Sequence, residues 1–327
     1  GVRSLLSETP PALVLSDRVM LFRPRGQALP APDGDELRLP GVDGSTWTPS
    51  GEPIVAVLDG LPVQNHPLLA GRLSIDDPDG WESDYPARDR VHGTAMTSLV
   101  LYGELDGSRV PLSRPIYVRP IMRPDPGDMR EPRQESTPDD VLLIDLVHRS
   151  VKRMFDGDAS SPAAAPTVKI INLSVGDLLK PFDTELSPWA RLLDWLSSKY
   201  QVLFVVSAGN VSAELTLPVP RGTLSTLSVD ARQRLAVPAL VADSVGRRVL
   251  TPGESINAIT VGAVHADGST FVQTSDRFDL FPNQGISPYF CIVHGFRRAV
   301  KPDILMPCGR VLHRERYVGD PGITELQ

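Results

Sequence analysis

The residues of this sequence that could do chemistry are an aspartate, a histidine and an asparagine. Asp59 and Asn210 each follow a short apolar run, and His92 opens a stretch of small and apolar residues. An aspartate beside a histidine orients the imidazole and stabilises the imidazolium that forms when the ring takes a proton from a nucleophile. An asparagine amide can stabilise the developing oxyanion, which is worth on the order of 10²–10³ in rate. The three residue types together predict nucleophilic catalysis on a carbonyl group.

These side chains can meet only if the fold brings distant segments together. Short β-branched runs alternate with longer stretches of helical periodicity, which is typical of right-handed βαβ units and a mainly parallel sheet with helices on both faces. The predicted strands are 54–58, 116–121, 168–173, 202–206, 256–264 and 301–306, and the predicted helices are 92–102, 137–154, 187–200 and 227–242. The carboxyl ends of parallel strands share one edge, where α/β proteins place their chemistry. Asp59, Ser174 and Asn210 each come just after a strand.

Residue types at the segment ends predict where helices begin. His92 stands at a helix start, where the positive end of the helix dipole lowers an imidazole pKa and helps to keep a base neutral. Ser187 and Thr137 are each followed by proline, the combination typical of an N-cap and the first helical position. The segment 122–138 is polar and rich in proline, and we interpret it as a surface loop.

Composition excludes several classes of protein. The chain has 327 residues, 41% hydrophobic and 22% charged, which is enough for a large core. Its net charge of −7 argues against a nucleic-acid partner, because phosphate binding needs a clustered basic surface. No apolar run reaches the roughly 18–20 residues of a membrane span. The sequence has no signal peptide, and Cys291 and Cys308 are interpreted as small buried residues, so we expect a cytoplasmic protein.

Six blocks of the sequence resemble those of the subtilases, the subtilisin-like serine peptidases. Asp59 lies in Val-Ala-Val-Leu-Asp-Gly, and His92 lies in Val-His-Gly-Thr-Ala-Met. The other blocks occur in the family's order and span 171–176, 206–210, 259–263 and 301–309. A chance match of six ordered blocks is very improbable.

The resemblance implies a subtilisin-like three-layer α/β fold over 51–327, preceded in 1–50 by a Pro- and Gly-rich arm or small subdomain. It implies that Asp59 and His92 are triad members of a serine endopeptidase and that Asn210 is the oxyanion donor. The peptide or protein substrate is expected to lie along the remaining matched residues, namely Ser174, Val175, Gly176, Ser207, Ala208 and Gly209. No cofactor and no catalytic metal are required; a structural Ca²⁺ is compatible with the family, but no ligand set can be assigned.

The sequence departs from the family pattern most clearly at the nucleophile. The aspartate block reads Asp59-Gly60-Leu61 where Asp-Thr-Gly or Asp-Ser-Gly is usual, and Cys308 replaces a glycine or small residue. Subtilases carry the serine in a Gly-Thr-Ser-x-Ala block after the Lys-Pro-Asp block, and no serine follows Arg310. Ser287, in the loop before that block, is interpreted as structural. We expect the serine to lie beyond Gln327, so that this chain alone is inactive.

Three explanations fit the absent serine: a sequence cut before the nucleophile, a split or processed enzyme whose serine is on another segment or chain, and a pseudoprotease that binds peptides as a scaffold. We favour the first, because a pseudoenzyme has no need to keep Asp59, His92 and Asn210 together. A different class is a metal-dependent hydrolase, in which ligands would come from Asp59, His66, Asp76, Asp77, Asp79 and His92. That class is less favoured, since no compact pattern such as His-Glu-x-x-His is present.

Overall fold

The central element of the fold is an eight-stranded sheet, seen in a computed structural model that describes residues 28–29, 48–103, 105, 110–210, 214–244, 246–267, 277–289, 291, 293–316 and 322–326. Its strands are β2 (Val55–Asp59), β3 (Leu73–Ile75), β4 (Ile116–Pro120), β7 (Ile170–Leu173), β9 (Leu203–Ser207), β12 (Ile259–His265), β14 (Gly285–Ile286) and β17 (Ile304–Pro307). They lie in the order β14-β12-β9-β7-β2-β4-β3, with β17 paired to β12. All these pairs are parallel except β12 with β14. The predicted α/β fold is confirmed.

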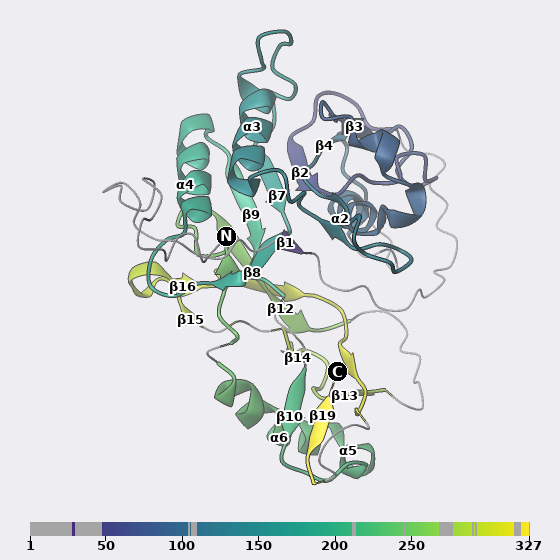
Figure 1. The fold of residues 1–327 in the computed structure, drawn as a ribbon, viewed down its shortest axis with the longest axis vertical. Coiled ribbons are helices and arrows are strands. Elements are labelled where there is room, and N and C mark those ends of the chain that lie inside the picture. Colours follow the sequence, from purple (N-terminus) through teal and green to yellow (C-terminus); the bar gives the residue numbers. More distant parts are fainter. Residues whose placement is uncertain are drawn as a thin grey trace, which may run out of the picture.

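Helices cover both faces of this sheet. α3 (Leu143–Phe155) and α4 (Pro188–Tyr200) pack on one face, and α2 (Val91–Tyr102) packs on the other (Figure 1). Successive residues of β2 alternate between the two cores: Leu58 belongs to the α3–α4 cluster and Val57 to the cluster beside α2. Because each face is covered, the central strands are apolar without alternation.

A smaller lobe lies below the sheet in Figure 1 and encloses its own apolar cluster. Its elements are α5 (Thr223–Thr226), α6 (Val229–Ala242), β10 (Leu215–Leu217), β13 (Phe278–Asp279), β18 (Leu312–His313) and β19 (Thr324–Leu326). β10 pairs with β19 and β13 with β18, both antiparallel. The lobe therefore holds segments that are more than a hundred residues apart in the sequence.

Short antiparallel strands complete the fold around the sheet. They are β1 (Ala28–Leu29), β8 (Gly176–Pro181) and β11 (Leu250–Thr251), the pair β5 (Arg123–Pro124) and β6 (Glu135–Ser136), and the pair β15 (Val293–His294) and β16 (Val300–Lys301). β8 lies between β1 and β11, and β1 also lies beside β6. The described part of the chain also contains the short 3₁₀ helices η1 (Trp81–Asp84), η2 (Ala87–Asp89) and η3 (Phe296–Arg298). Within the described ranges, no helix has the length and apolar character needed to cross a bilayer.

Several predicted boundaries are confirmed because they rest on local residue chemistry. α4 begins at Pro188, and the Ser187 hydroxyl accepts a hydrogen bond from the Ala190 N–H at 3.0 Å. α2 begins one residue before His92 and ends at Tyr102, where Gly103 adopts a positive φ of 72°. Such a φ is easily reached by glycine and seldom by other residues.

Other expectations are wrong. The segment 122–138 contains the β5–β6 pair and buries residues 135–137, so it is not simply a surface loop. Thr137 does not cap α3, which begins at Leu143. Cys291 is buried as expected, whereas Cys308 is exposed. The predicted arm or subdomain at 1–50 lies outside the described residues, apart from 28–29 and 48–50.

Candidate active site

Asp59 and His92 form a direct side-chain pair at the carboxyl edge of the sheet. Asp59 Oδ1 lies 2.7 Å from His92 Nδ1, and both residues are buried. The same oxygen accepts a hydrogen bond from the Gly60 N–H at 2.7 Å. A carboxylate against Nδ1 selects the tautomer in which Nδ1 carries the proton, so the second ring nitrogen becomes the basic atom.

The glycine after His92 lets the histidine helix approach the turn that follows Asp59 closely. A Cβ on Gly93 would lie 2.2 Å from the Gly60 carbonyl oxygen, well inside van der Waals contact. The first turn of α2 therefore packs directly on the backbone that follows β2. This contact between backbones requires a glycine after His92. It also brings His92 within hydrogen-bonding distance of Asp59, which lies 33 positions earlier in the sequence.

Glu135 is a residue of the site that the sequence interpretation missed. It comes from β6, it is 3% exposed, and its Oε2 accepts a hydrogen bond from the His92 backbone N–H at 2.6 Å. Its Oε1 accepts a hydrogen bond from the hydroxyl of Tyr85, which is also buried. A single glutamate in a polar, proline-rich segment gives no sequence signal of such a position.

The structure brings the two predicted substrate-binding segments together. A Cβ on Gly176 would lie 3.7 Å from the Cα of Gly209, so the start of β8 adjoins the turn after β9. Gly209 has a φ of 107° and donates its N–H to the Ser207 hydroxyl at 3.0 Å. Leu250 of β11 donates its N–H to the Ala208 carbonyl at 2.9 Å, and β11 in turn pairs with β8.

Asn210 and Ser174 lie at the same edge of the sheet as the Asp59–His92 pair. Ser174 comes directly after β7, the strand between β2 and β9, and its hydroxyl accepts a hydrogen bond from the Asn172 amide at 3.1 Å. Asn210 comes three residues after the end of β9 and is half-buried. The topology thus places Asp59 at the end of β2, and Ser174 and Asn210 after the adjacent strands β7 and β9.

The Lys-Pro-Asp block anchors β17 against β12. Lys301 is buried, and its Nζ lies 3.0 Å from the Ala258 carbonyl oxygen and 2.7 Å from Asp303 Oδ2. Asp303 also accepts a hydrogen bond from the Thr260 N–H at 2.7 Å. Ser287 is buried and accepts a hydrogen bond from the Tyr289 N–H at 3.2 Å, which fits its interpretation as structural.

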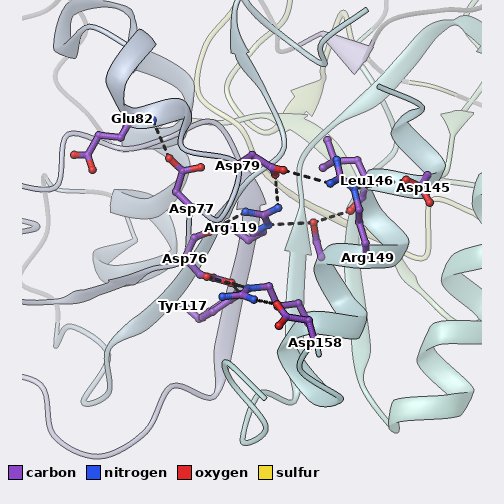
Figure 2. Close-up of polar contacts among 12 residues, drawn as sticks. Asp76, Asp77, Asp79, Glu82, Tyr117, Arg119, Asp145, Leu146, Arg149 and Asp158 are labelled. Carbon is purple, nitrogen blue, oxygen red and sulfur yellow. Dashed lines mark hydrogen bonds and ion pairs between the residues drawn. The ribbon is translucent and has the colours of Figure 1, made fainter. Parts of the chain in front are cut away.

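Two of the acidic residues that follow β3, Asp76 and Asp79, pair with arginines, whereas Asp77 accepts a hydrogen bond from the Glu82 N–H at 2.8 Å (Figure 2). The buried Arg119 of β4 donates to Asp79 Oδ2 at 2.5 Å, and Asp76 Oδ2 lies 2.9 Å from Arg153 Nε of α3. Asp76 also accepts a hydrogen bond from the Tyr117 hydroxyl at 2.5 Å, and burial together with this contact raises the tyrosine pKa. Across the described ranges, no three acidic, histidine or cysteine side chains are grouped to hold a metal ion. The ion pairs of Asp76 and Asp79 thus tie the β3–β4 region to α3.

Comparison with known proteins identifies the relatives of this chain. The model of the subtilase family matches residues 50–323. Among solved structures, the prenylagaramide maturation protease PagA matches at 17% identity with a TM-score of 0.33, over 64% of this chain and 52% of that one. The patellamide maturation protease PatA matches at 17% identity with a TM-score of 0.34, over 66% of this chain and 58% of that one. The chain thus spans less than two thirds of either neighbour, and no curated protein matches it.

The family match covers most of the chain, including both members of the buried Asp59–His92 pair. The chain belongs to the subtilase family.

Proposed function

We propose that this chain is the acid–base part of a serine endopeptidase that hydrolyses peptide bonds through an acyl-enzyme. The observation that carries the proposal is the 2.7 Å contact between Asp59 Oδ1 and His92 Nδ1. In this mechanism His92 Nε2 takes the proton of a serine hydroxyl as the serine attacks the scissile carbonyl. Asp59 holds the ring in position and stabilises the imidazolium, and His92 then protonates the leaving amine.

Asn210 is proposed as the donor that stabilises the tetrahedral oxyanion. Its place after β9, beside the Ser207–Gly209 turn, supports this role, because the carboxyl edge of the sheet is where the attacked carbonyl must lie. A preorganised amide donor acts at the oxygen where negative charge develops and needs no reorganisation during the reaction.

The peptide substrate is proposed to bind as an added strand at Ser174, Val175 and Gly176. β1 supports this proposal, because it pairs antiparallel with β8 in the register Leu29 to Gly176 and Ala28 to Asp177. An edge that accepts one extended segment can accept another through the same main-chain hydrogen bonds. A substrate must displace β1 to use this edge, since β11 occupies the other side of β8.

The nucleophilic serine is proposed to lie on a segment that follows Gln327. β17 supports this proposal, because its consecutive residues Ile304, Leu305 and Met306 are 45%, 46% and 51% exposed. Successive side chains of a strand point to opposite faces, so both faces of β17 are uncovered in the described part of the chain. Strands of parallel sheets are normally covered on both faces, and a helix that carries the serine would supply such a cover.

A serine-directed fluorophosphonate probe tests the peptidase proposal. We expect stoichiometric labelling of a protein extended through a Gly-Thr-Ser block and no labelling of residues 1–327 alone, because the probe reacts only with a serine activated by a base. Labelling is read by intact-protein mass spectrometry. Stoichiometric labelling of residues 1–327 would contradict the proposed position of the nucleophile. A stop codon after residue 327, or an extended protein that binds peptides without labelling, would favour the peptide-binding scaffold.

If a peptide adds as a strand at Gly176, it must compete with β1 for the same backbone edge. Replacing Leu29 by proline removes a backbone N–H and disfavours the pairing with Gly176, so we expect extended hexapeptides to bind severalfold more tightly. Leu29→Ala is the matched control, because it shortens the side chain and keeps the backbone donor. Affinities from fluorescence anisotropy that are equal in the two variants would argue against strand addition at β8.

The location proposed for the enzyme is the cytoplasm. Cys291 and Cys308 are unpaired thiols, which is compatible with a reducing compartment.

A further inference from the structure

The helix that carries His92 begins without a cap of its own. The first N–H groups of any α-helix lack partners within the helix and are usually satisfied by a nearby side chain. At α2 the N-cap residue is Arg90, which makes no side-chain cap, and the first turn contains no acidic residue. His92 is the second residue of the helix, so its N–H is one of these groups.

Glu135 supplies the missing cap from 43 residues away. Its Oε2 accepts the His92 N–H at 2.6 Å, and its Oε1 is held by the hydroxyl of Tyr85. A carboxylate suits this place, because the N-terminus of a helix carries partial positive charge. With both oxygens engaged and the side chain buried, the carboxylate is fixed in one orientation.

The unusual glycine after the catalytic aspartate makes room for this carboxylate. A Cβ on Gly60 would lie 1.9 Å from Glu135 Oε1 and 2.6 Å from the Tyr85 hydroxyl oxygen. Serine or threonine, usual after the aspartate in the subtilase pattern, cannot occupy this position while Glu135 and Tyr85 stand where they do. The Asp-Gly departure and the buried glutamate are therefore two parts of one local arrangement.

A second contact holds the β5–β6 segment against the entry to α2. Arg133 Nε lies 2.8 Å from Asp89 Oδ2, and the Arg133 N–H donates to Asp89 Oδ1 at 3.0 Å. Asp89 is fully buried and lies three residues before His92. The segment thus contacts the start of the helix at two points, the Asp89 carboxylate and the His92 N–H. The Arg133–Asp89 contact fixes the backbone next to Glu135 and so helps to position the glutamate.

We propose that Glu135 is a positioning residue for the catalytic base: held by Tyr85, it fixes the His92 backbone and thereby sets the imidazole against Asp59. The expected effect of Glu135 on turnover rests on the proposed function. Its expected effect on the Asp59–His92 contact does not. His92 is then constrained from two directions, through its ring by Asp59 and through its N–H by Glu135. Misplacing a reacting group by about 1 Å can cost on the order of 10² in rate.

The test compares Glu135→Gln with Glu131→Gln. Gln keeps the size of Glu135 and removes its charge; Glu131, in the same segment, is 72% exposed and serves as the matched control. In residues 1–327, NMR of ¹⁵N-histidine-labelled protein follows the His92 backbone amide proton and the Nδ1 proton shared with Asp59. We expect Glu135→Gln to shift the amide proton upfield and to weaken the Nδ1 proton signal by faster exchange, and we expect Glu131→Gln to change neither.

Turnover is measured separately in the protein extended through the serine. We expect Glu135→Gln to lower kcat by about 10- to 100-fold with KM within twofold, because the base is displaced and the peptide site is not. Glu135→Asp, which restores the charge, should recover part of this loss. If the extended wild-type protein has no turnover, the proposed function fails, and the NMR comparison still decides the role of Glu135.

Two outcomes would overturn the proposal. One is an unchanged Nδ1 proton signal and unchanged kcat in Glu135→Gln. The other is a lower melting temperature with the Nδ1 signal intact, which would make Glu135 merely structural. If Glu135→Gln does not fold, Tyr85→Phe replaces it, because this variant leaves the carboxylate in place and removes only its second hydrogen bond.

Discussion

Replacing His92 by alanine is expected to lower kcat by on the order of 10⁵–10⁶ in the protein that carries the serine, with little change in KM. The loss is large because a serine hydroxyl is a poor nucleophile until a base removes its proton, and triad members act as a unit. The 2.7 Å contact with Asp59 holds the imidazole in one orientation. A water molecule that replaces the imidazole in His92→Ala would not be held in this way and would be a poor base. Steady-state kinetics with a chromogenic peptide ester gives both constants.

The control for this prediction is His66→Ala. His66 is exposed, and its Nδ1 accepts a hydrogen bond from the Leu68 N–H at 3.2 Å. His66 is also one of the expected ligands in a metal-dependent hydrolase, so the two variants separate the mechanisms. A peptidase needs His92 and tolerates His66→Ala. Comparable losses in both variants, restored by added transition metal, would refute the serine mechanism.

Replacing Asp59 by asparagine is expected to lower kcat by about 10⁴ at neutral pH. The asparagine side chain would retain the size of the aspartate. If its amide nitrogen takes the position of Oδ1, which contacts both His92 Nδ1 and the Gly60 N–H, it donates to Nδ1 and selects the wrong tautomer, and the Gly60 N–H loses its acceptor. The substitution would also remove the negative charge that stabilises the imidazolium. We therefore expect Asp59→Asn to fold and to bind peptide, but to hydrolyse it very slowly.

The matched control is Asp84→Asn, at an exposed aspartate of η1. Melting temperatures and the anisotropy of a bound peptide report whether either variant is damaged outside its chemistry. Asp59→Asn with intact folding, unchanged peptide affinity and wild-type kcat would remove Asp59 from the mechanism. A loss of the same size in Asp84→Asn would point to a general charge effect instead.

The sheet and the acid–base pair could be predicted from sequence because their signals are local. β2, β7 and β9 are short apolar runs whose side chains enter the apolar cores, and α4 begins with a serine cap followed by proline. Asp59 and His92 occur within blocks whose neighbours, Gly60 and Gly93, are dictated by close packing. In these segments the residue types along the chain indicate the structure, even where the packing that requires them joins distant parts of the sequence.

The β5–β6 region could not be predicted because its structure depends on tertiary contacts. Each of its strands is only two residues long. Its polar side chains bind residues far away in the sequence: Arg133 pairs with Asp89, and Glu135 accepts hydrogen bonds from His92 and Tyr85. A polar, proline-rich composition indicates a loop when no partner is known. The start of α3 differs from the predicted one for a similar reason, since Thr137 is buried beside this segment instead of capping the helix.

The exposed strand β17 has a consequence for the handling of this chain in solution. Its described residues pair on one side with β12, and three consecutive apolar side chains are about half exposed. An uncovered apolar strand at the border of a sheet is a template for pairing with another molecule. Residues 1–327 produced alone should therefore self-associate as concentration rises, and co-expression with the segment proposed to follow Gln327 should keep the protein monodisperse in light scattering.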